Sequence, residues 1–247
     1  MTSMFSEVAR FYAESRPLYP DALIHNIRDI CVEHKLAWDC GTGNGQAARS
    51  FIPFFDKVYA SDISPEQLSF AYRHPKIEYF CVPAECSGFR DKVFDLVTVA
   101  EAIHWFELSL FESEVFRVLK PGAILAAWHY DAIKLEDTAI QECLNQLREL
   151  VKDGWSNEAR RIKDPIKFDD RRFESFPSLQ FCAEQRWEYE RMAKNIMTWS
   201  AVRSFTKRGS HCEAELDALL KAIRGFWGDQ SRTIRFNIYL DTWRRKA

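Results

Sequence analysis

The sequence predicts an α/β fold built on a parallel, doubly wound sheet, and three observations carry this prediction. Short apolar runs alternate with helical patterns over residues 20–130. The apolar run at residues 36–39 stops at a glycine-rich turn, and a helical pattern follows that turn directly. The run at residues 94–100, FDLVTVA, is nearly all apolar, as in a strand that is covered on both faces. The length of 247 residues suits one domain with an elaboration.

The first half of the chain supplies five strand patterns and the helical patterns between them. Ser64 and Pro65 suit the cap and the first position of one helix, and KPG at residues 120–122 suits the end of another. We therefore expect helices at residues 20–34, 46–55, from 64 onward and at 108–119, and strands at 36–39, 57–62, 77–81, 94–100 and 123–130.

The second half of the chain is more charged and more helical than the first. Residues 181–189 and 233–240 alternate apolar and polar side chains, which predicts two strands that return to the same sheet. Apolar residues at helical spacing predict helices at residues 136–152, 192–207 and 213–226. No Gly/Ser-rich or Pro-rich linker separates these patterns from the first half.

Composition and charge argue against nucleic acids, membranes and metal ions as binding partners. The net charge of −2 provides no global field for nucleic acid or an anionic membrane. Seven cysteines without a CxxC pair, and six histidines without metal-ligand spacing, predict reduced thiols and no metal. No run approaches about 18 apolar residues, and the N-terminus lacks a basic start followed by an apolar run. We expect a soluble, cytoplasmic protein that binds neither membrane nor nucleic acid.

The glycine turn DCGTGNG identifies a ligand-binding position. Glycines let a ligand lie against the backbone, but here Gly45 comes one residue too early for the dinucleotide pattern GxGxxG. Asp39 leads into the turn and would repel a pyrophosphate, whereas it could attract a cationic ligand such as S-adenosylmethionine. Asp62 ends the next strand, 21 residues after Gly41, where a carboxylate can accept both ribose hydroxyls. NAD enzymes use the same device, so Asp62 alone does not discriminate.

Four motifs in order, DCGTGNG, Asp62, FDLVTVAEAIHW and FRVLKPG, together resemble class I S-adenosylmethionine-dependent methyltransferases over residues 36–130. SRPLYP, AIHW and TWSA are similar to the small-molecule branch of that family, methyltransferase type 11, which includes trans-aconitate methyltransferase-like and related carboxyl methyltransferases. The resemblance implies a Rossmann-like sheet of seven strands with helices on both faces. It also implies an antiparallel last strand at residues 233–240.

The resemblance further implies one methyltransferase domain in which successive segments of the chain have different roles. Residues 1–35 would form a lid and the first helix, and residues 36–130 the cofactor-binding core. Residues 131–230 would hold helices, the sixth strand and a helical substrate cap at residues 190–230, and residues 231–247 the last strand.

The resemblance assigns cofactor contacts to several positions of this sequence. Asp39, Gly41, Thr42 and Gly43 would line the methionine end, Asp62 the ribose and Ile63 the adenine. Ala84 and Glu85 fall where the family contacts adenine, and Cys86 is an equal alternative for the contact with the adenine amino group. Ala100 and Glu101 end the fourth strand beside the sulfonium, although Glu101 could also cap a helix. Arg16 could pair with a carboxylate of the cofactor or of the substrate.

Chemistry and substrate binding are expected around the AIHW motif. His104 could donate to a substrate carboxylate or act as a base, and Trp105 could supply an apolar wall. The alternatives are a histidine that orders its loop and a tryptophan of the core. Further residues expected to meet the substrate are Tyr12, Tyr19, His129, Tyr130, Trp199 and Arg203, although packing would explain Trp199 equally well.

The sequence therefore predicts methyl transfer from S-adenosylmethionine, with S-adenosylhomocysteine as product, to a small-molecule acceptor. A carboxylate or a thiol needs no strong base. The resemblance to carboxyl methyltransferases implies oxygen of a carboxylate as the favoured acceptor atom, with Arg16, His104 and Arg203 recognising the acid. AEAI replaces the NPPY-like tetrapeptide that amino-methylating enzymes of nucleic acids often carry after the fourth strand. The alternatives are N- or C-methylation of a small metabolite and, less favoured, an NAD-type oxidoreductase or a non-catalytic cofactor-binding module.

Overall fold

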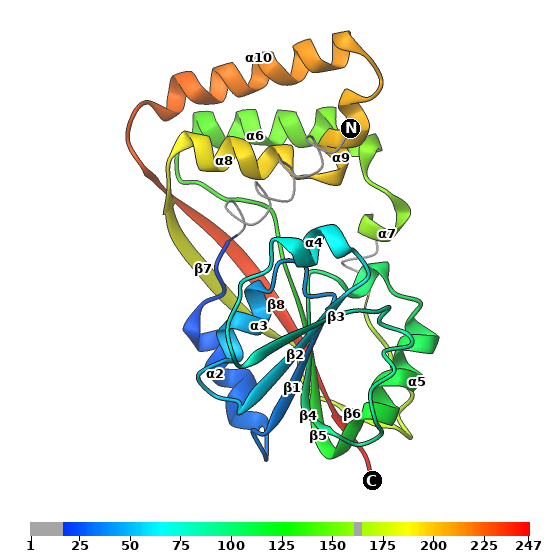
Figure 1. Ribbon diagram of the computed structural model, residues 1–247. Helices are drawn as coiled ribbons and strands as arrows, with labels where there is room; N and C mark the ends of the chain where they lie inside the picture. The colour runs from blue at the N-terminus through cyan, green and yellow to red at the C-terminus, as the bar shows by residue number, and fades with distance from the viewer. Residues whose placement is uncertain (1–16, 161–164) are drawn as a thin grey trace. The chain divides into compact units, whose positions relative to one another are not determined.

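The computed structural model describes residues 17–160 and 165–247 and separates into two compact units (Figure 1). The described residues of Leu18–Tyr130, Ile162–Cys182 and Asn237–Ala247 form one unit, which we call the sheet unit. The described residues of Asp131–Arg161 and Ala183–Phe236 form most of the other, which we call the helical unit.

An eight-stranded sheet confirms the predicted α/β class. Its order is β3-β2-β1-β4-β5-β8-β6, and β7 pairs with β8. The first five strands are parallel, and β8 is antiparallel to β5, as expected of the last strand. The bounds are β1 (Leu36–Cys40), β2 (Lys57–Asp62), β3 (Ile77–Cys81), β4 (Phe94–Ala100), β5 (Leu119–Tyr130), β6 (Phe173–Ser175), β7 (Leu179–Trp187) and β8 (Arg232–Arg245).

The strand beyond the expected seven is β6. It contains only FES and pairs antiparallel with the end of β8, where Phe173 lies opposite Arg245. Three residues are too few to show an alternating pattern, so the sequence gives no signal for this strand. Strand β5 also begins earlier than predicted, because Leu119 already pairs with Phe94 before the register shifts at KPG.

Helices cover both sides of the sheet, with α2 and α3 on one side and α5 on the other (Figure 1). Helix α3 ends at Phe51, earlier than predicted. Ile52 still has helical backbone angles, but Pro53 has no N–H to continue the helical hydrogen bonds. The helices of the sheet unit are α2 (Asp21–Ile30), α3 (Gln46–Phe51), α4 (Pro65–Ser69), the 3₁₀ turn η1 (Ile103–Trp105) and α5 (Leu108–Val118).

The core of the sheet unit is dominated by large aromatic side chains. Trp38, Phe94 and Phe111 are fully buried and belong to one cluster between the sheet and α5. Burying each such side chain stabilises the fold by roughly 2–3 kcal/mol. The indole N–H of Trp38 donates to the Ser61 hydroxyl at 2.9 Å, so this buried polar group is satisfied. Much of the high aromatic content therefore serves the core.

The helical unit is built mainly from helices, which Figure 1 draws as α6, α7, α8, α9 and α10. The predicted helix at residues 192–207 is in fact two helices. Trp199 is extended, with φ −65° and ψ 132°, and the Thr198 hydroxyl donates to the Asn195 carbonyl at 2.6 Å. The bounds are α6 (Thr138–Leu150), the 3₁₀ turn η2 (Lys152–Gly154), α7 (Asn157–Arg160), α8 (Tyr189–Met197), α9 (Ser200–Thr206) and α10 (Ser210–Trp227). Across the described ranges, no helix is long and apolar enough to cross a membrane.

Candidate active site

The glycine turn after β1 is folded by left-handed backbone at Gly41, Gly43 and Gly45, whose φ angles are +66°, +57° and +83°. A Cβ on Gly41 would lie 2.6 Å from the Ala102 Cβ, and a Cβ on Gly45 would collide with the Tyr79 hydroxyl. Beside Gly43 the nearest atom within 4 Å is Gln67 Oε1, at 3.9 Å from such a Cβ. Packing therefore explains two of the glycines, and the open backbone at Gly43 is the place that a ligand can approach.

The buried carboxylate of Asp39 fixes this turn through hydrogen bonds. Its side chain is 1% exposed and accepts hydrogen bonds from Thr42 Oγ1 (2.5 Å), the Ala48 amide (2.9 Å) and Thr98 Oγ1 (2.8 Å). Burial raises the pKa of the carboxyl to about 6, although these hydrogen bonds oppose the rise. Asp39 thus ties the turn to the start of α3 and to β4.

Asp62, at the end of β2, is bound to the same turn. Its Oδ2 accepts from the Gly43 amide at 2.8 Å, and its Oδ1 accepts from the Ser64 amide at 2.9 Å. Each carboxylate oxygen can accept more than one hydrogen bond, so both keep capacity for a ligand. The next residue, Ile63, is 73% exposed, which is unusual for a large aliphatic side chain.

Glu101 joins the ends of β4 and β5. Its backbone has φ 57°, a left-handed conformation that is costly outside glycine and that concentrates at functional sites. Its amide donates to the Trp128 carbonyl at 2.9 Å, and its Oε1 accepts from the Tyr130 amide at 2.5 Å. No side chain caps η1, which begins after Ala102, so Glu101 does not act there as a helix cap. Ala100, the last residue of β4, is partly exposed at the same edge.

His104 and Trp105 lie on η1, directly after this edge. His104 is half-buried, and its Nδ1 is buried without a hydrogen-bond partner among the described residues. Burial, helped by His129, lowers the pKa of the imidazole to about 4, so His104 is neutral at pH 7. Trp105 is 52% exposed, with its ring centroid 5.0 Å from that of His104, so it is not a core residue.

Aromatic residues at the end of β5 border the same edge. The ring of Tyr19 meets that of Trp128 edge-on at 5.2 Å, and His129 stacks on Tyr239 at 5.3 Å. The backbone of Tyr130 is held by Glu101, as described above. The structure therefore brings Tyr19, His129 and Tyr130 to the end of the strand that neighbours Glu101.

The expected adenine-side residues, Ala84 and Glu85, follow β3. Ala84 is 7% exposed and belongs to the core cluster. Glu85 Oε1 accepts from the Glu107 amide at 2.9 Å, which ties the loop to the start of α5. Both residues thus have structural contacts of their own in the described chain.

One site residue escaped the sequence reasoning. Gln67 Oε1 is buried without a partner in the described part of the chain, and it faces the open side of Gly43. The signal that could have revealed it is position: Gln67 lies in the single turn of helix that follows Asp62.

Four predicted residues lie outside the described part of the sheet unit. Tyr12 and Arg16 lie outside the described residues. Trp199 and Arg203 belong to the helical unit, where Trp199 precedes α9 with its ring 6.1 Å from that of Trp155, and Arg203 is exposed. Within the described ranges, no group of three His, Cys, Asp or Glu side chains could hold a metal ion.

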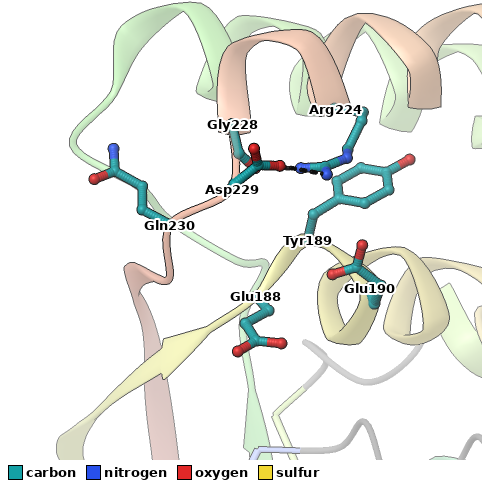
Figure 2. A pocket seen from close by; sticks show the side chains of 7 residues that line it. All are labelled: Glu188, Tyr189, Glu190, Arg224, Gly228, Asp229 and Gln230. Carbon is teal, nitrogen blue, oxygen red and sulfur yellow. Dashed lines mark hydrogen bonds and ion pairs between the residues drawn. The ribbon is translucent and has the colours of Figure 1, made fainter.

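The helical unit contains a pocket of about 230 Å³ at the C-terminal end of α10 (Figure 2). Arg224 points into it, pairs with Asp229 at 2.7 Å and lies 5.3 Å from the ring centre of Tyr189. The cation is thus neutralised by its own neighbour, and we assign no ligand to this pocket. Its lining residues are Glu188, Tyr189, Glu190, Arg224, Gly228, Asp229 and Gln230.

Known proteins are similar to this chain in fold and in sequence. The family described as "Methyltransferase domain" matches residues 38–127. The structure of a protein named as a type II methyltransferase, from Anaeromyxobacter dehalogenans, has a TM-score of 0.78 and 30% identity, over 93% of this chain and 97% of that one.

Two curated relatives extend the likeness. A Dictyostelium discoideum protein named as a methyltransferase is 28% identical over 243 residues, covering 96% of this chain and 92% of its own length. A Saccharomyces cerevisiae protein named as an S-adenosylmethionine-dependent methyltransferase is 32% identical over 156 residues, which are 60% of this chain and 52% of the relative. The chain therefore belongs to the class I S-adenosylmethionine-dependent methyltransferases.

Proposed function

We propose that this methyltransferase binds S-adenosylmethionine at the edge formed by Gly43, Asp62 and Glu101, and that it methylates oxygen of a small-molecule carboxylate. The observation that carries the choice of acceptor is the neutral, half-buried imidazole of His104 beside that edge. When bound, the cofactor supplies a methyl group that its sulfonium already activates. The residues of the chain have to hold the two reactants in line and exclude water.

The donor set beside the glycine turn fits the cofactor. Asp62 is oriented by the Gly43 and Ser64 amides and keeps the acceptor capacity that a ribose diol requires. The exposed side chain of Ile63 offers an apolar surface for adenine. Gln67 Oε1, which has no partner among the described residues, can accept an N–H or O–H from the ligand.

We assign the other predicted cofactor residues either to fixing the glycine turn or to bordering the bound cofactor. Asp39 and Thr42 are hydrogen-bonded to each other, so we assign them to fixing the turn. Gly41 lets Ala102 approach the turn closely. Ala100 and Glu101 would border the methyl group, and Ala84 and Glu85 would border the adenine. Arg16 stays a prediction from the sequence.

The properties of His104 favour an acceptor that is already a nucleophile. A base is most effective when its pKa lies near the working pH, and a group with a pKa of about 4 is poorly suited to deprotonate a hydroxyl. A carboxylate is ionised at neutral pH and needs no base. Neutral imidazole can still donate one N–H to a carboxylate oxygen, and the exposed ring of Trp105 can supply an apolar wall. Tyr19, His129 and Tyr130 would complete the surroundings of the acceptor.

A product analysis tests this function. The enzyme would be incubated with methyl-labelled S-adenosylmethionine and a panel of small carboxylic acids, each beside its primary amide. We expect labelled product from at least one acid and none from its amide, and alkali should release the label as methanol, because methyl esters hydrolyse readily. Label that survives alkali would show that the methyl group is not on a carboxylate oxygen and would overturn the carboxylate assignment.

A further inference from the structure

Arg148 of the helical unit is a largely buried cation that forms no ion pair with any described carboxylate. It lies near the end of α6, and its Nη2 donates to the Ile133 carbonyl at 2.7 Å, while its Nη1 donates to the Asn145 side-chain oxygen at 3.2 Å. Its Nε is buried and has no partner among the described residues. Both acceptors are neutral, whereas buried charges in proteins are normally paired with an opposite charge.

The carboxylates of this unit do not neutralise Arg148. In the described chain, none lies within 4 Å of its guanidinium. Asp131 attracts it from a longer distance and forms its ion pair with Lys134 at 2.8 Å. Arg232 of the same unit shows the usual arrangement, because it pairs with Asp137 at 2.8 Å. Desolvation lowers the pKa of Arg148, which means that burial disfavours its charged form.

Two tryptophan rings lie beside this cation. The Trp199 ring centre is 5.9 Å from Arg148 Cζ, and the Trp155 ring centre is 6.1 Å from that of Trp199 at an angle of 34°. Trp199 is oriented by its indole N–H, which donates to Asn195 Oδ1 at 3.2 Å. Both rings are only half-buried, so part of each faces solvent.

The local sequence explains why these groups meet. A Cβ on Gly154 would collide with the Ala201 carbonyl, so glycine is what allows η2 to lie against α9. This close approach places Trp155, the residue after η2, beside Trp199, the residue before α9. Backbone packing therefore brings the two tryptophans together, and hydrogen bonds to Ile133 and Asn145 hold the Arg148 guanidinium beside them.

We propose that Arg148, Trp155 and Trp199 form a binding site for a small aromatic carboxylate in the helical unit. The acid's carboxylate would accept hydrogen bonds from the N–H groups of Nη1 and Nη2 that Asn145 and Ile133 leave unused, since arginine can bind a carboxylate with two parallel hydrogen bonds. Its ring would contact the two tryptophans. The site concerns binding by this unit, and it requires neither cofactor nor methyl transfer.

Calorimetric titration in the absence of cofactor tests this site with matched probes. Benzoate and indole-3-acetate carry the proposed chemistry, while benzamide and indole-3-acetamide keep the shape without the charge. We expect the better acid to bind the wild type at least about ten-fold more tightly than its amide, a difference of about 1.4 kcal/mol. Equal affinity for acid and amide, or no binding of either acid, would overturn the site.

Two arginine variants locate the site. Arg148→Gln should weaken acid binding at least about ten-fold, and Arg148→Lys should weaken it less, because lysine keeps the charge but not the planar fork. Arg208→Gln is the matched control, since Arg208 is exposed in the same unit with its guanidinium 5.9 Å from the Phe205 ring centre, and it should bind acid as the wild type does. Unchanged acid affinity in folded Arg148→Gln would contradict the proposal.

A second variant keeps the test decisive if Arg148→Gln fails to fold. Trp155→Leu removes one wall of the site and leaves the guanidinium, so it should weaken both acids, and the larger indole-3-acetate more. Equal acid affinity in Trp155→Leu and the wild type would count against the proposal. Because these titrations contain no methyl donor, their outcome is independent of whether the enzyme esterifies carboxylates.

Discussion

The Gly43 amide donates a hydrogen bond to Asp62 Oδ2 at 2.8 Å and so joins the glycine turn after β1 to the end of β2, across 19 positions of sequence. The same carboxylate accepts from the Ser64 amide at the start of the next helix. One side chain thus connects the glycine turn to the loop that follows β2. Substitution of Gly43 or Asp62 should therefore weaken cofactor binding.

Gly43→Ala should weaken binding of S-adenosylhomocysteine at least about ten-fold, because the added methyl group would occupy the open side of the turn. Gly88→Ala is the matched control: Gly88 has φ +71°, and a Cβ there meets nothing within 4 Å. Both variants should lose a similar 1–2 kcal/mol or so of unfolding free energy to the left-handed backbone. If calorimetry gives both variants the same loss of ligand affinity, Gly43 does not face the cofactor.

Asp39 should make the protein less stable as pH rises from about 4 to about 6. Its folded-state pKa of about 6 lies above its ordinary value of 3.8, so the native state binds more protons than the unfolded state in this window. Asp39→Asn lacks this titration and keeps an amide of the same shape.

The measurement for Asp39 is urea unfolding of the wild type and Asp39→Asn at pH 4 and pH 6.5. Stability of the wild type relative to the variant should fall by roughly 2–3 kcal/mol over that interval. A difference between the two proteins that does not change with pH would show that the Asp39 carboxyl titrates normally.

His104→Ala should reduce turnover at least about ten-fold while leaving affinity for S-adenosylhomocysteine within about two-fold, because the imidazole is assigned to the acceptor. His104→Gln, which can still donate an N–H, should recover part of the activity. Equal losses of turnover and cofactor affinity would make His104 a structural residue.

The pKa of His104 gives a second readout. Since burial lowers this pKa to about 4, the imidazole resonances of His104 should keep their neutral shifts in NMR spectra down to about pH 5. By the same shift, the unfolded state binds a proton that the native state does not, so His104 destabilises the protein as pH falls from about 6.5 toward 4. Protonation near pH 6.5 would remove the argument for a carboxylate acceptor.

The sequence predicted those parts of the fold that depend on local pattern. Strands β2, β3 and β4 have the predicted bounds, because apolar runs and their punctuation define buried parallel strands. The break between α8 and α9 was missed, since it depends on a side-chain hydrogen bond of Thr198 and on the extended conformation of Trp199. The narrower likeness to trans-aconitate methyltransferase-like enzymes stays a prediction.

In the candidate site, too, some features could be predicted from the sequence and others could not. The strand-end positions of Asp62 and Glu101 could be predicted, because parallel strands bring their carboxyl ends to one edge. The roles of Asp39 and Arg148 could not be predicted, because they depend on which side chains surround them in the folded chain. The sequence alone does not show that Asp39 is buried among three donors or that Arg148 Nε is buried without a partner in the described chain.

The most direct test of the account is calorimetric binding of S-adenosylhomocysteine to the wild type and to Asp62→Ala. Asp56→Ala is the control, because Asp56 is an exposed carboxylate just before β2 begins. We expect micromolar binding to the wild type and the control, no binding of NAD to either, and at least about ten-fold weaker binding to a folded Asp62→Ala, about 1.4 kcal/mol. Equal affinity of Asp62→Ala and the wild type would contradict the assignment of this edge to the cofactor.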